Sequence, residues 1–232
     1  MDKRVVFLCS GGGGNLRFIH QAIENNWLSE LSLVSVLTDR ECGANEYSRS
    51  NNIDNRCIDF SQVGQTELID SLYFYQPDVI VTTVHRILCQ DVVKEFGTKL
   101  INLHYSLLPA FAGLIGTKPV KEAIAYGSQF TGVTVHCVDK NLDTGRPLLQ
   151  VAIPLRSSDS INSLMDLVFR CGCISLGSAI NYSLSNDKDD NYLVEDIIKI
   201  KDRFCVFSKK INLVPDILDE KFWENLRSYS QN

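Results

Sequence analysis

The first hundred residues alternate short apolar runs with stretches of helical periodicity, and this alternation constrains the fold more than any other feature. Five segments are typical of β-strands, namely residues 5–10, 33–38, 56–59, 79–84 and 100–104. Four segments between them have the apolar spacing of α-helices, namely residues 15–25, 44–51, 66–75 and 90–96. Strands separated by helices indicate βα units on a parallel sheet. The chain is therefore predicted to have an α/β fold.

The pattern changes after residue 115, where strands begin to follow one another directly. A helix is predicted over residues 117–126, and two alternating segments, 131–138 and 147–153, predict a hairpin around a polar loop. A long helix over residues 160–184 follows, capped by Asp159 or Ser160. We predict a mostly parallel Rossmann-like sheet flanked by helices, with a C-terminal hairpin and a long helix.

The length of 232 residues fits one domain with an appendage. Residues 185–191 are charged and rich in turn formers, which is typical of a linker. We therefore expect a catalytic domain over residues 1–184 and a small appendage of unassigned role over residues 185–232.

Composition excludes several classes of partner. With 23 basic and 28 acidic side chains the net charge is −5, which disfavours broad nucleic-acid binding. No apolar run approaches the roughly 18 residues of a membrane span. The basic and apolar start breaks into Ser10 and four glycines, so we predict a first strand of a cytoplasmic protein rather than a leader.

The eight cysteines include no C-x-x-C pair. A disulfide framework belongs to small secreted domains, so we expect most of these cysteines to be buried as small apolar residues. The four histidines have no paired i, i+4 spacing, and no metal site is expected.

A run of four glycines, residues 11–14, separates the first strand from the first helix. Glycines let the backbone approach an anion, and the amides of a helix N-terminus point toward it. The run fits neither the Walker A motif nor the Gly-x-Gly-x-x-Gly spacing of dinucleotide sites. A tight turn needs fewer glycines, so a phosphate monoester site is the favoured interpretation.

Asn102 and His104 stand at the end of a predicted buried strand, where the period of two places both on one face. Sites of open α/β sheets lie at this carboxyl edge. An aspartate such as Asp143, in the predicted hairpin loop, would hold the histidine ring and favour its charged form. Charged histidine and asparagine together can donate hydrogen bonds to an oxyanion that develops on a carbonyl group.

Nucleophilic catalysis fits the sequence less well. Ser106 is close to His104 but lacks the Gly-x-Ser-x-Gly elbow. Cys89 could form a Cys–His pair, although nothing in its surroundings marks an activated thiol.

These motifs occur in an order that resembles the formyltransferase family that uses 10-formyltetrahydrofolate. The resemblance rests on the blocks at residues 10–16, 86–88, 101–113, 131–139 and 142–145. The likeness covers about residues 4–180.

The resemblance implies formyl transfer from 10-formyltetrahydrofolate, as co-substrate, to a primary amine of a phosphorylated small molecule, without a metal. It implies a catalytic trio of Asn102, His104 and Asp143. It also implies two binding groups: an acceptor phosphate held by Gly13, Gly14 and Asn15, and a folate held by His85, Arg86, Ile87, Leu88, Asn102, Asp139 and Asp143.

The acceptor that the resemblance implies first is glycinamide ribonucleotide of purine synthesis, with folate as the other partner and a homodimer as one possible assembly. Three departures from the family pattern concern this acceptor: Tyr105 replaces a usual proline, residues 83–85 replace Gly-Phe-Met, and the late helix has Arg170-Cys171-Gly172-Cys173. An amino sugar nucleotide is therefore an alternative acceptor. A non-catalytic folate- or nucleotide-binding relative is the second alternative.

Overall fold

The computed structural model describes residues 2–61, 65–185, 196–211 and 214–228. Apart from Ser185, the predicted linker lies outside these residues. The chain divides into two compact units: one comprises the residues up to Asn102 together with the last helix, and the other comprises Leu103–Leu218.

The first unit contains five parallel strands in the order β3-β2-β1-β4-β5. Their bounds are β1 Lys3–Cys9, β2 Leu31–Thr38, β3 Asn55–Cys57, β4 Val79–Thr83 and β5 Leu100–His104. Strand β1 is the centre of this sheet, and its side chains from Val5 to Cys9 are at most 1% exposed. Apolar side chains on both faces explain why this strand is a continuous hydrophobic run in the sequence.

Helices connect these strands, as the sequence pattern predicts. They are α1 Gly14–Glu24, α2 Gly43–Ser50, α3 Thr66–Tyr75 and α4 Gln90–Phe96. The chain moves outward from β1 to β2 and β3, and then returns to the other side of β1 for β4 and β5. The strand order therefore reverses between β1 and β4, which is where open α/β sheets bind their ligands.

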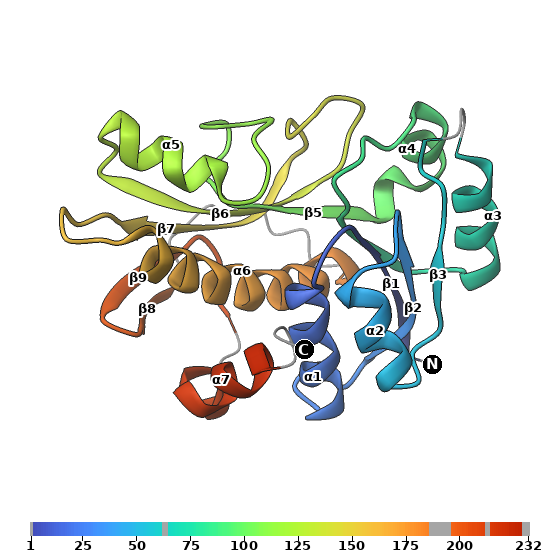
Figure 1. The fold of residues 1–232 in the computed structure, drawn as a ribbon, viewed down its shortest axis with the longest axis horizontal. Coiled ribbons are helices and arrows are strands. Elements are labelled where there is room, and N and C mark those ends of the chain that lie inside the picture. The colour runs from blue at the N-terminus through green and yellow to red at the C-terminus, as the bar shows by residue number, and fades with distance from the viewer. Residues whose placement is uncertain (1, 62–64, 186–195, 212–213, 229–232) are drawn as a thin grey trace. The chain divides into compact units, whose positions relative to one another are not determined.

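Helix α7, Glu220–Ser228, packs beside α1 (Figure 1). Trp223 is fully buried, and its ring stacks on Phe18 with a centroid distance of 5.5 Å and an interplanar angle of 8°. Phe222 meets the edge of the same Phe18 ring at 6.1 Å. The sequence pattern assigned no role to this C-terminal segment, and the structure places it in the core of the first unit.

The second unit carries four antiparallel strands in the order β6-β7-β9-β8. They are β6 Phe130–Cys137, β7 Pro147–Pro154, β8 Asp196–Ile200 and β9 Arg203–Phe207. The predicted hairpin is β6 and β7, whereas β8 and β9 were not predicted and extend it by two strands.

Two helices, α5 Lys118–Tyr126 and α6 Ile161–Leu184, belong to the second unit. Helix α6 runs along the strands of this unit (Figure 1) and contacts β6 and β7. It is long and apolar enough to cross a membrane by length and composition, but most of its apolar window is buried inside the structure. Packing against the sheet accounts for its apolar composition.

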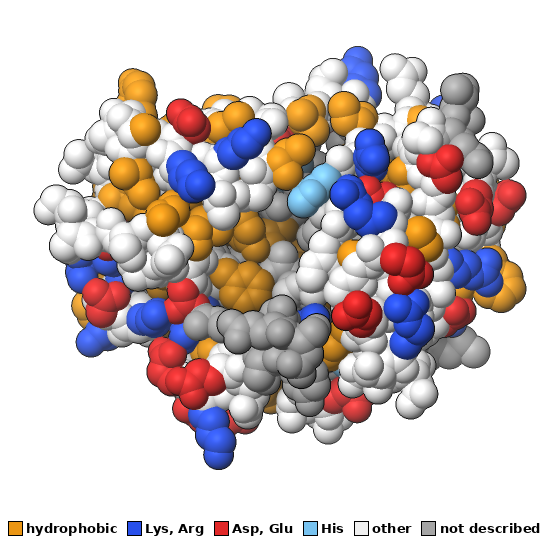
Figure 2. Space-filling view, viewed as in Figure 1, with side chains coloured by type: hydrophobic (Ala, Val, Ile, Leu, Met, Phe, Trp, Pro, Cys, Tyr) orange, Lys and Arg blue, Asp and Glu red, His pale blue; other side chains and the backbone are white. Residues whose placement is uncertain are grey.

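The described surface carries charges of both signs. Figure 2 shows acidic and basic side chains interspersed with apolar ones on one face of the molecule. Four of the eight cysteines, Cys9, Cys171, Cys173 and Cys205, are buried, whereas Cys57 is exposed. The expectation that most cysteines are buried therefore holds for only half of them, because Cys42, Cys89 and Cys137 are half-buried and Cys57 ends the short outer strand β3.

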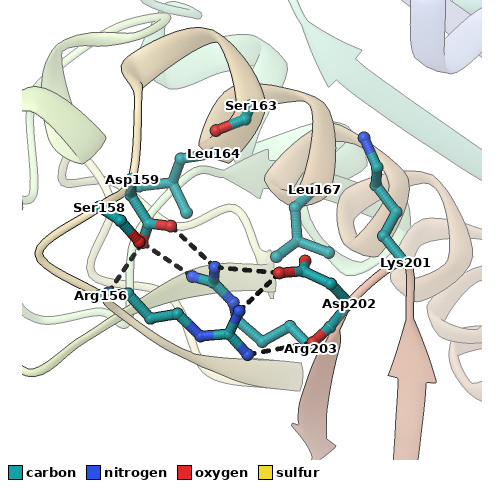
Figure 3. Close-up of a pocket in the computed structure, with 9 residues that line it drawn as sticks. All are labelled: Arg156, Ser158, Asp159, Ser163, Leu164, Leu167, Lys201, Asp202 and Arg203. Carbon is teal, nitrogen blue, oxygen red and sulfur yellow. Dashed lines mark hydrogen bonds and ion pairs between the residues drawn. The ribbon is translucent and has the colours of Figure 1, made fainter.

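A group of ion pairs fixes the β8–β9 turn beside the start of α6 (Figure 3). It surrounds a cavity of about 260 Å³. Arg203 donates to both carboxylate oxygens of Asp159 at 2.7 and 2.8 Å, and the two side chains are 5% and 8% exposed. The hydrogen bonds from Arg203 hold the pKa of Asp159 below its usual value. Arg156 and Asp202 form a more exposed pair in the same group.

Replacing Trp223 by alanine should reduce the free energy of unfolding by about 3–5 kcal/mol, because it empties the site between α7 and α1. Denaturant titration followed by circular dichroism measures this change. Tyr126, which is 84% exposed, provides the control, since Tyr126→Ala should change stability by less than about 0.5 kcal/mol. Equal stability of Trp223→Ala and the unmodified chain would show that α7 contributes nothing to the fold.

Replacing Asp159 by asparagine removes the buried carboxylate that receives two hydrogen bonds from Arg203 and leaves this cation only the exposed Asp202 at 3.8 Å, so it should cost about 3–5 kcal/mol at neutral pH. The pKa of Asp159 is lowered on folding, so its stabilisation is complete above the unfolded value of about 3.9 and is lost as pH falls through the folded pKa. The stability difference between the two proteins should therefore narrow below about pH 4. Asp202→Asn, at a side chain 65% exposed, should cost at most about 1 kcal/mol. If Asp159→Asn lowers the free energy of unfolding by the same amount at pH 7 and at pH 3, this account is contradicted.

Candidate active site

The glycine run forms the turn between β1 and α1. Gly13 has a φ of +70°, and a Cβ built on it would lie 3.2 Å from the Cβ of Ala44. Both backbone strain and lack of space therefore favour glycine there. A Cβ on Gly11 or Gly12 would meet nothing within 4 Å. Of the predicted acceptor-binding residues, Gly13 is the N-cap of helix α1, and Gly14 and Asn15 are its first two residues. Because Gly13 has no side chain, no side-chain hydrogen bond caps this helix.

The loop after β4 carries the residues predicted to contact folate. The amide of His85 donates to Ser10 Oγ at 2.6 Å, which ties this loop to the end of β1. Ile87 is 78% exposed and Leu88 is half-buried, so the loop offers an apolar surface. Gln65 holds the loop in place: its Nε2 donates to the carbonyl of Ile87, and its Oε1 accepts from the amide of Cys89, both at 3.1 Å.

Asp39, at the end of β2, anchors Arg86 of the same loop. Its Oδ2 lies 3.3 Å from Arg86 Nε and 2.8 Å from Arg40 Nη2. Burial of this carboxylate opposes its ionisation, but hydrogen bonds from Arg40, Ser10 and Arg86 lower its pKa below the usual value. Asp39 therefore stays charged at neutral pH and keeps Arg86 in position.

Asn102 lies on β5 beside the end of β4. Its side-chain Nδ2 donates to the carbonyl of Thr82 at 2.7 Å. An amide nitrogen carries two hydrogens, so this bond orients the group and uses one of them. Asn102 and His104 are two residues apart on the same strand, which places them on one face of β5.

The second unit brings His104 and Asp143 together. His104 is 6% exposed, and its Nδ1 lies 3.4 Å from Asp143 Oδ2. Its Nε2 lies 3.1 Å from the carbonyl oxygen of Phe111. Asp143 has a φ of +54°, and its Oδ2 also accepts the amide of Gly113 at 2.7 Å. The aspartate therefore binds both the histidine and the loop that faces the other side of the ring.

His136 on β6 is a second histidine beside Asp143, and sequence reasoning did not single it out. Its Nε2 lies 3.7 Å from Asp143 Oδ1, and its Nδ1 contacts the carbonyl of Cys137 at 2.8 Å. Burial holds the pKa of His136 below its usual value, so the ring is neutral at pH 7 with its proton on Nδ1. The available signal was one polar, titratable residue in an otherwise apolar part of the strand.

Asp139 has a structural task in the loop that carries Asp143. Its Oδ1 accepts the amide of Asn141 at 3.0 Å and the hydroxyl of Thr144 at 2.7 Å. An aspartate that bonds the backbone two residues later forms an Asx-turn. This turn shapes the loop that carries Asp143.

The hydroxyl of Ser106 donates to the carbonyl of Ala110 at 2.5 Å, which directs it away from the role of a nucleophile activated by His104. Thus the structure pairs His104 with Asp143, orients Asn102 on the same strand, and places the glycine loop and the residue 85–88 loop at neighbouring strands. Gln65, Asp39 and Phe111 are contacts that only the folded chain reveals.

The model of the formyl transferase family matches residues 3–176. The chain belongs to this family. The match includes the glycine loop, β5 with Asn102 and His104, and the Asp143 loop, and it ends within α6. This family membership fits the α/β fold and the position of the glycine loop, the residue 85–88 loop and Asn102 at the carboxyl ends of β1, β4 and β5 in the first unit.

Named relatives of this formyl transferase include a chloroplastic phosphoribosylglycinamide formyltransferase of Vigna unguiculata, 32% identical over 170 residues. That match covers 70% of this chain and 54% of the relative, so the chain spans about half the length of that plant protein. Phosphoribosylglycinamide formyltransferase of Mycobacterium tuberculosis is 32% identical over 171 residues, which cover 71% of this chain and 77% of the relative.

Solved structures show the same fold. The crystal structure of phosphoribosylglycinamide formyltransferase from Bacillus halodurans is 25% identical, with a TM-score of 0.73, and covers 82% of this chain and all of that chain. A formyltetrahydrofolate deformylase from Pseudomonas syringae shares the fold at 22% identity and a TM-score of 0.69, covering 78% of this chain and 60% of its own.

Asp143→Asn should lower the pKa of His136 further, because the negative charge of Asp143 favours the charged form of this ring. The measurement is a pH titration of the imidazole nitrogens by ¹⁵N NMR. Asp139→Asn is the matched control. The charge of Asp139 also favours charged His136 but acts on it more weakly than that of Asp143, so the pKa shift should be smaller. An unchanged His136 titration in Asp143→Asn would mean that the two side chains do not interact.

Proposed function

We propose that this chain transfers the formyl group of 10-formyltetrahydrofolate to the primary amine of glycinamide ribonucleotide, a step of purine synthesis. The observation that carries the proposal is the contact between His104 and Asp143 in a member of the formyl transferase family. Asn102 lies two residues before His104 on β5. Relatives named phosphoribosylglycinamide formyltransferase support this choice of acceptor.

In the proposed reaction, the acceptor amine attacks the formyl carbon, and the carbonyl oxygen becomes an oxyanion. His104 donates from Nε2, and Asn102 donates its second amide hydrogen, to this oxygen. The oxyanion then replaces the carbonyl of Phe111 as the acceptor for Nε2. The bond from the formyl carbon to N10 of the folate breaks, and the proton lost by the amine reaches N10. Asp143 holds the imidazole ring and stabilises its charge.

Two further groups would bind the substrates. Gly13, Gly14 and Asn15 at the start of α1 suit the phosphate of the acceptor, because a helix N-terminus favours an anion. His85, Arg86, Ile87 and Leu88 suit the pterin ring, since their loop combines exposed apolar surface with backbone groups fixed by Gln65. Asp139 and Asp143 complete the proposed folate contacts.

We also propose that residues 1–184 carry the catalytic machinery, which the end of the family match at residue 176 supports, and that residues 185–232 are an appendage in sequence, whose described part adds β8 and β9 to the second unit and α7 to the first. The protein is proposed to act in the cytoplasm on small molecules, without a nucleic-acid or membrane partner, with a homodimer as the proposed assembly. The net charge of −5 is consistent with small-molecule substrates.

His104→Ala should lower kcat about 10²–10³-fold, because it removes a donor to the oxyanion. Release of tetrahydrofolate, followed by absorbance with glycinamide ribonucleotide as acceptor, measures the rate. Thermal unfolding and folate binding, by fluorescence titration, should remain close to those of the unmodified chain.

Cys89→Ala is the control, since the mechanism needs no thiol nucleophile, and it should retain full activity. Near-normal turnover of His104→Ala would contradict the assigned role. An unmodified chain that binds folate but transfers no formyl group to glycinamide ribonucleotide or to an amino sugar nucleotide would instead be a non-catalytic relative.

A further inference from the structure

Arg17 is a buried cation directly behind the glycine loop. It stands in the first turns of α1 and is 3% exposed. Burial lowers its pKa from the usual value, but a guanidinium remains protonated at neutral pH. Burying a charge costs free energy unless hydrogen bonds or opposite charges compensate it. The contacts of Arg17 therefore indicate its role.

The guanidinium of Arg17 joins the glycine loop to α2. Its Nε donates to the carbonyl of Gly12 at 3.1 Å, and its central carbon, Cζ, lies 5.0 Å from the centre of the Tyr47 ring. Its Nη2 would lie 3.7 Å from a Cβ built on Gly43, the first residue of α2. Arg17 therefore sits between the loop that follows β1 and the helix that follows β2.

The carbonyl groups of Gly11, Gly12 and Gly13 bond either to α2 or to Arg17. The carbonyl of Gly11 accepts the amide of Ala44 at 3.1 Å, and that of Gly13 accepts the amide of Arg17 at 2.8 Å. The carbonyl of Gly12 accepts Arg17 Nε. In a trans peptide the C=O and the following N–H point in opposite directions. The amides that follow these carbonyls therefore point away from α2 and Arg17, as an anion site requires.

We propose that Arg17 is the positioning residue of the phosphate loop, holding the Gly12 carbonyl inward so that the next amide faces a phosphate monoester. The inference deepens the proposed function and rests on its assignment of the acceptor phosphate to this loop. The positive charge of Arg17 lies behind the loop and strengthens its preference for a dianion. Because the side chain is buried, Arg17 acts through the loop backbone rather than by touching the ligand.

The experiment measures binding of inorganic phosphate to the full chain. Phosphate is titrated into ¹⁵N-labelled protein, and the amide signals of residues 12–15 are followed by NMR. Arg17→Met removes both charge and donor, and should weaken phosphate binding at these amides on the order of tenfold or more. Arg17→Lys keeps the charge but loses the planar donor geometry, and should recover part of the affinity.

Arg49→Gln provides the matched control. Arg49 is on α2 but is half exposed and pairs with Glu41, so its loss should leave phosphate affinity unchanged. In the formyl transfer assay, Arg17→Met should raise KM for the phosphorylated acceptor while kcat and KM for the folate stay within about twofold. A purely structural loss would lower kcat and change both KM values. If Arg17→Met does not fold, judged by its melting curve, Arg17→Gln and Arg17→Lys replace it in the same titration.

Two results overturn the inference: phosphate shifts no amide of the glycine loop in the unmodified chain, or a folded Arg17 variant without the charge binds phosphate as well as the unmodified chain. The proposed function fails separately. If the chain binds phosphate with the expected dependence on Arg17 but transfers no formyl group, the role of Arg17 stands and the proposed reaction is wrong. If the chain transfers the group with an Arg17-independent KM, the reverse holds.

Discussion

The parallel pairing of β1 with both β2 and β4 is the constraint on which the first unit depends. Strand β1 is buried on both faces, and its neighbours supply hydrogen bonds on both edges. The strand order reverses between β1 and β4. The loops that follow these two strands therefore begin at neighbouring strand ends. The bond from His85 to Ser10 crosses this point. The glycine loop and the proposed pterin loop are close because the sheet brings their strands side by side, although more than sixty residues separate them.

In the second unit, Asp143 is the residue on which the arrangement of the candidate site depends. Its carboxylate lies beside His104 and His136 and accepts the amide of Gly113. Its left-handed backbone conformation is uncommon for a residue other than glycine, and such strain persists where surrounding contacts enforce it. One side chain thereby controls both the ring orientation of His104, the proposed donor to the oxyanion, and the position of the loop whose carbonyl contacts the same ring.

Local patterns predicted the βα units, the hairpin and the long helix, because burial imposes period two on strands and helical spacing on helices. The same patterns missed β8, β9 and α7. Strands β8 and β9 are short, and their exposed positions include the apolar Ile197 and Phe204, so polar and apolar residues do not alternate in the sequence. Helix α7 has few apolar residues, and Trp223 among them packs on the distant Phe18. Their structure comes from contacts with distant residues, which no local pattern records.

The sequence by itself determined the α/β class, the tight turn that the glycine run makes before the first helix, and the placement of Asn102 and His104 on one strand face, because each follows from local backbone geometry. Asp143 entered through resemblance, since nothing local relates it to a histidine 39 residues earlier. Tertiary structure decided which groups meet: His136 beside Asp143, Gln65 and Asp39 holding the loop after β4, and Arg17 behind the glycines. Gln65 and Asp39 are 22 and 47 residues from their partners in that loop, and the nearer pairs, His136 with Asp143 and Arg17 with Gly12, meet only once the hairpin and the first helix have formed. Local sequence patterns record none of these contacts, because each depends on how the elements pack.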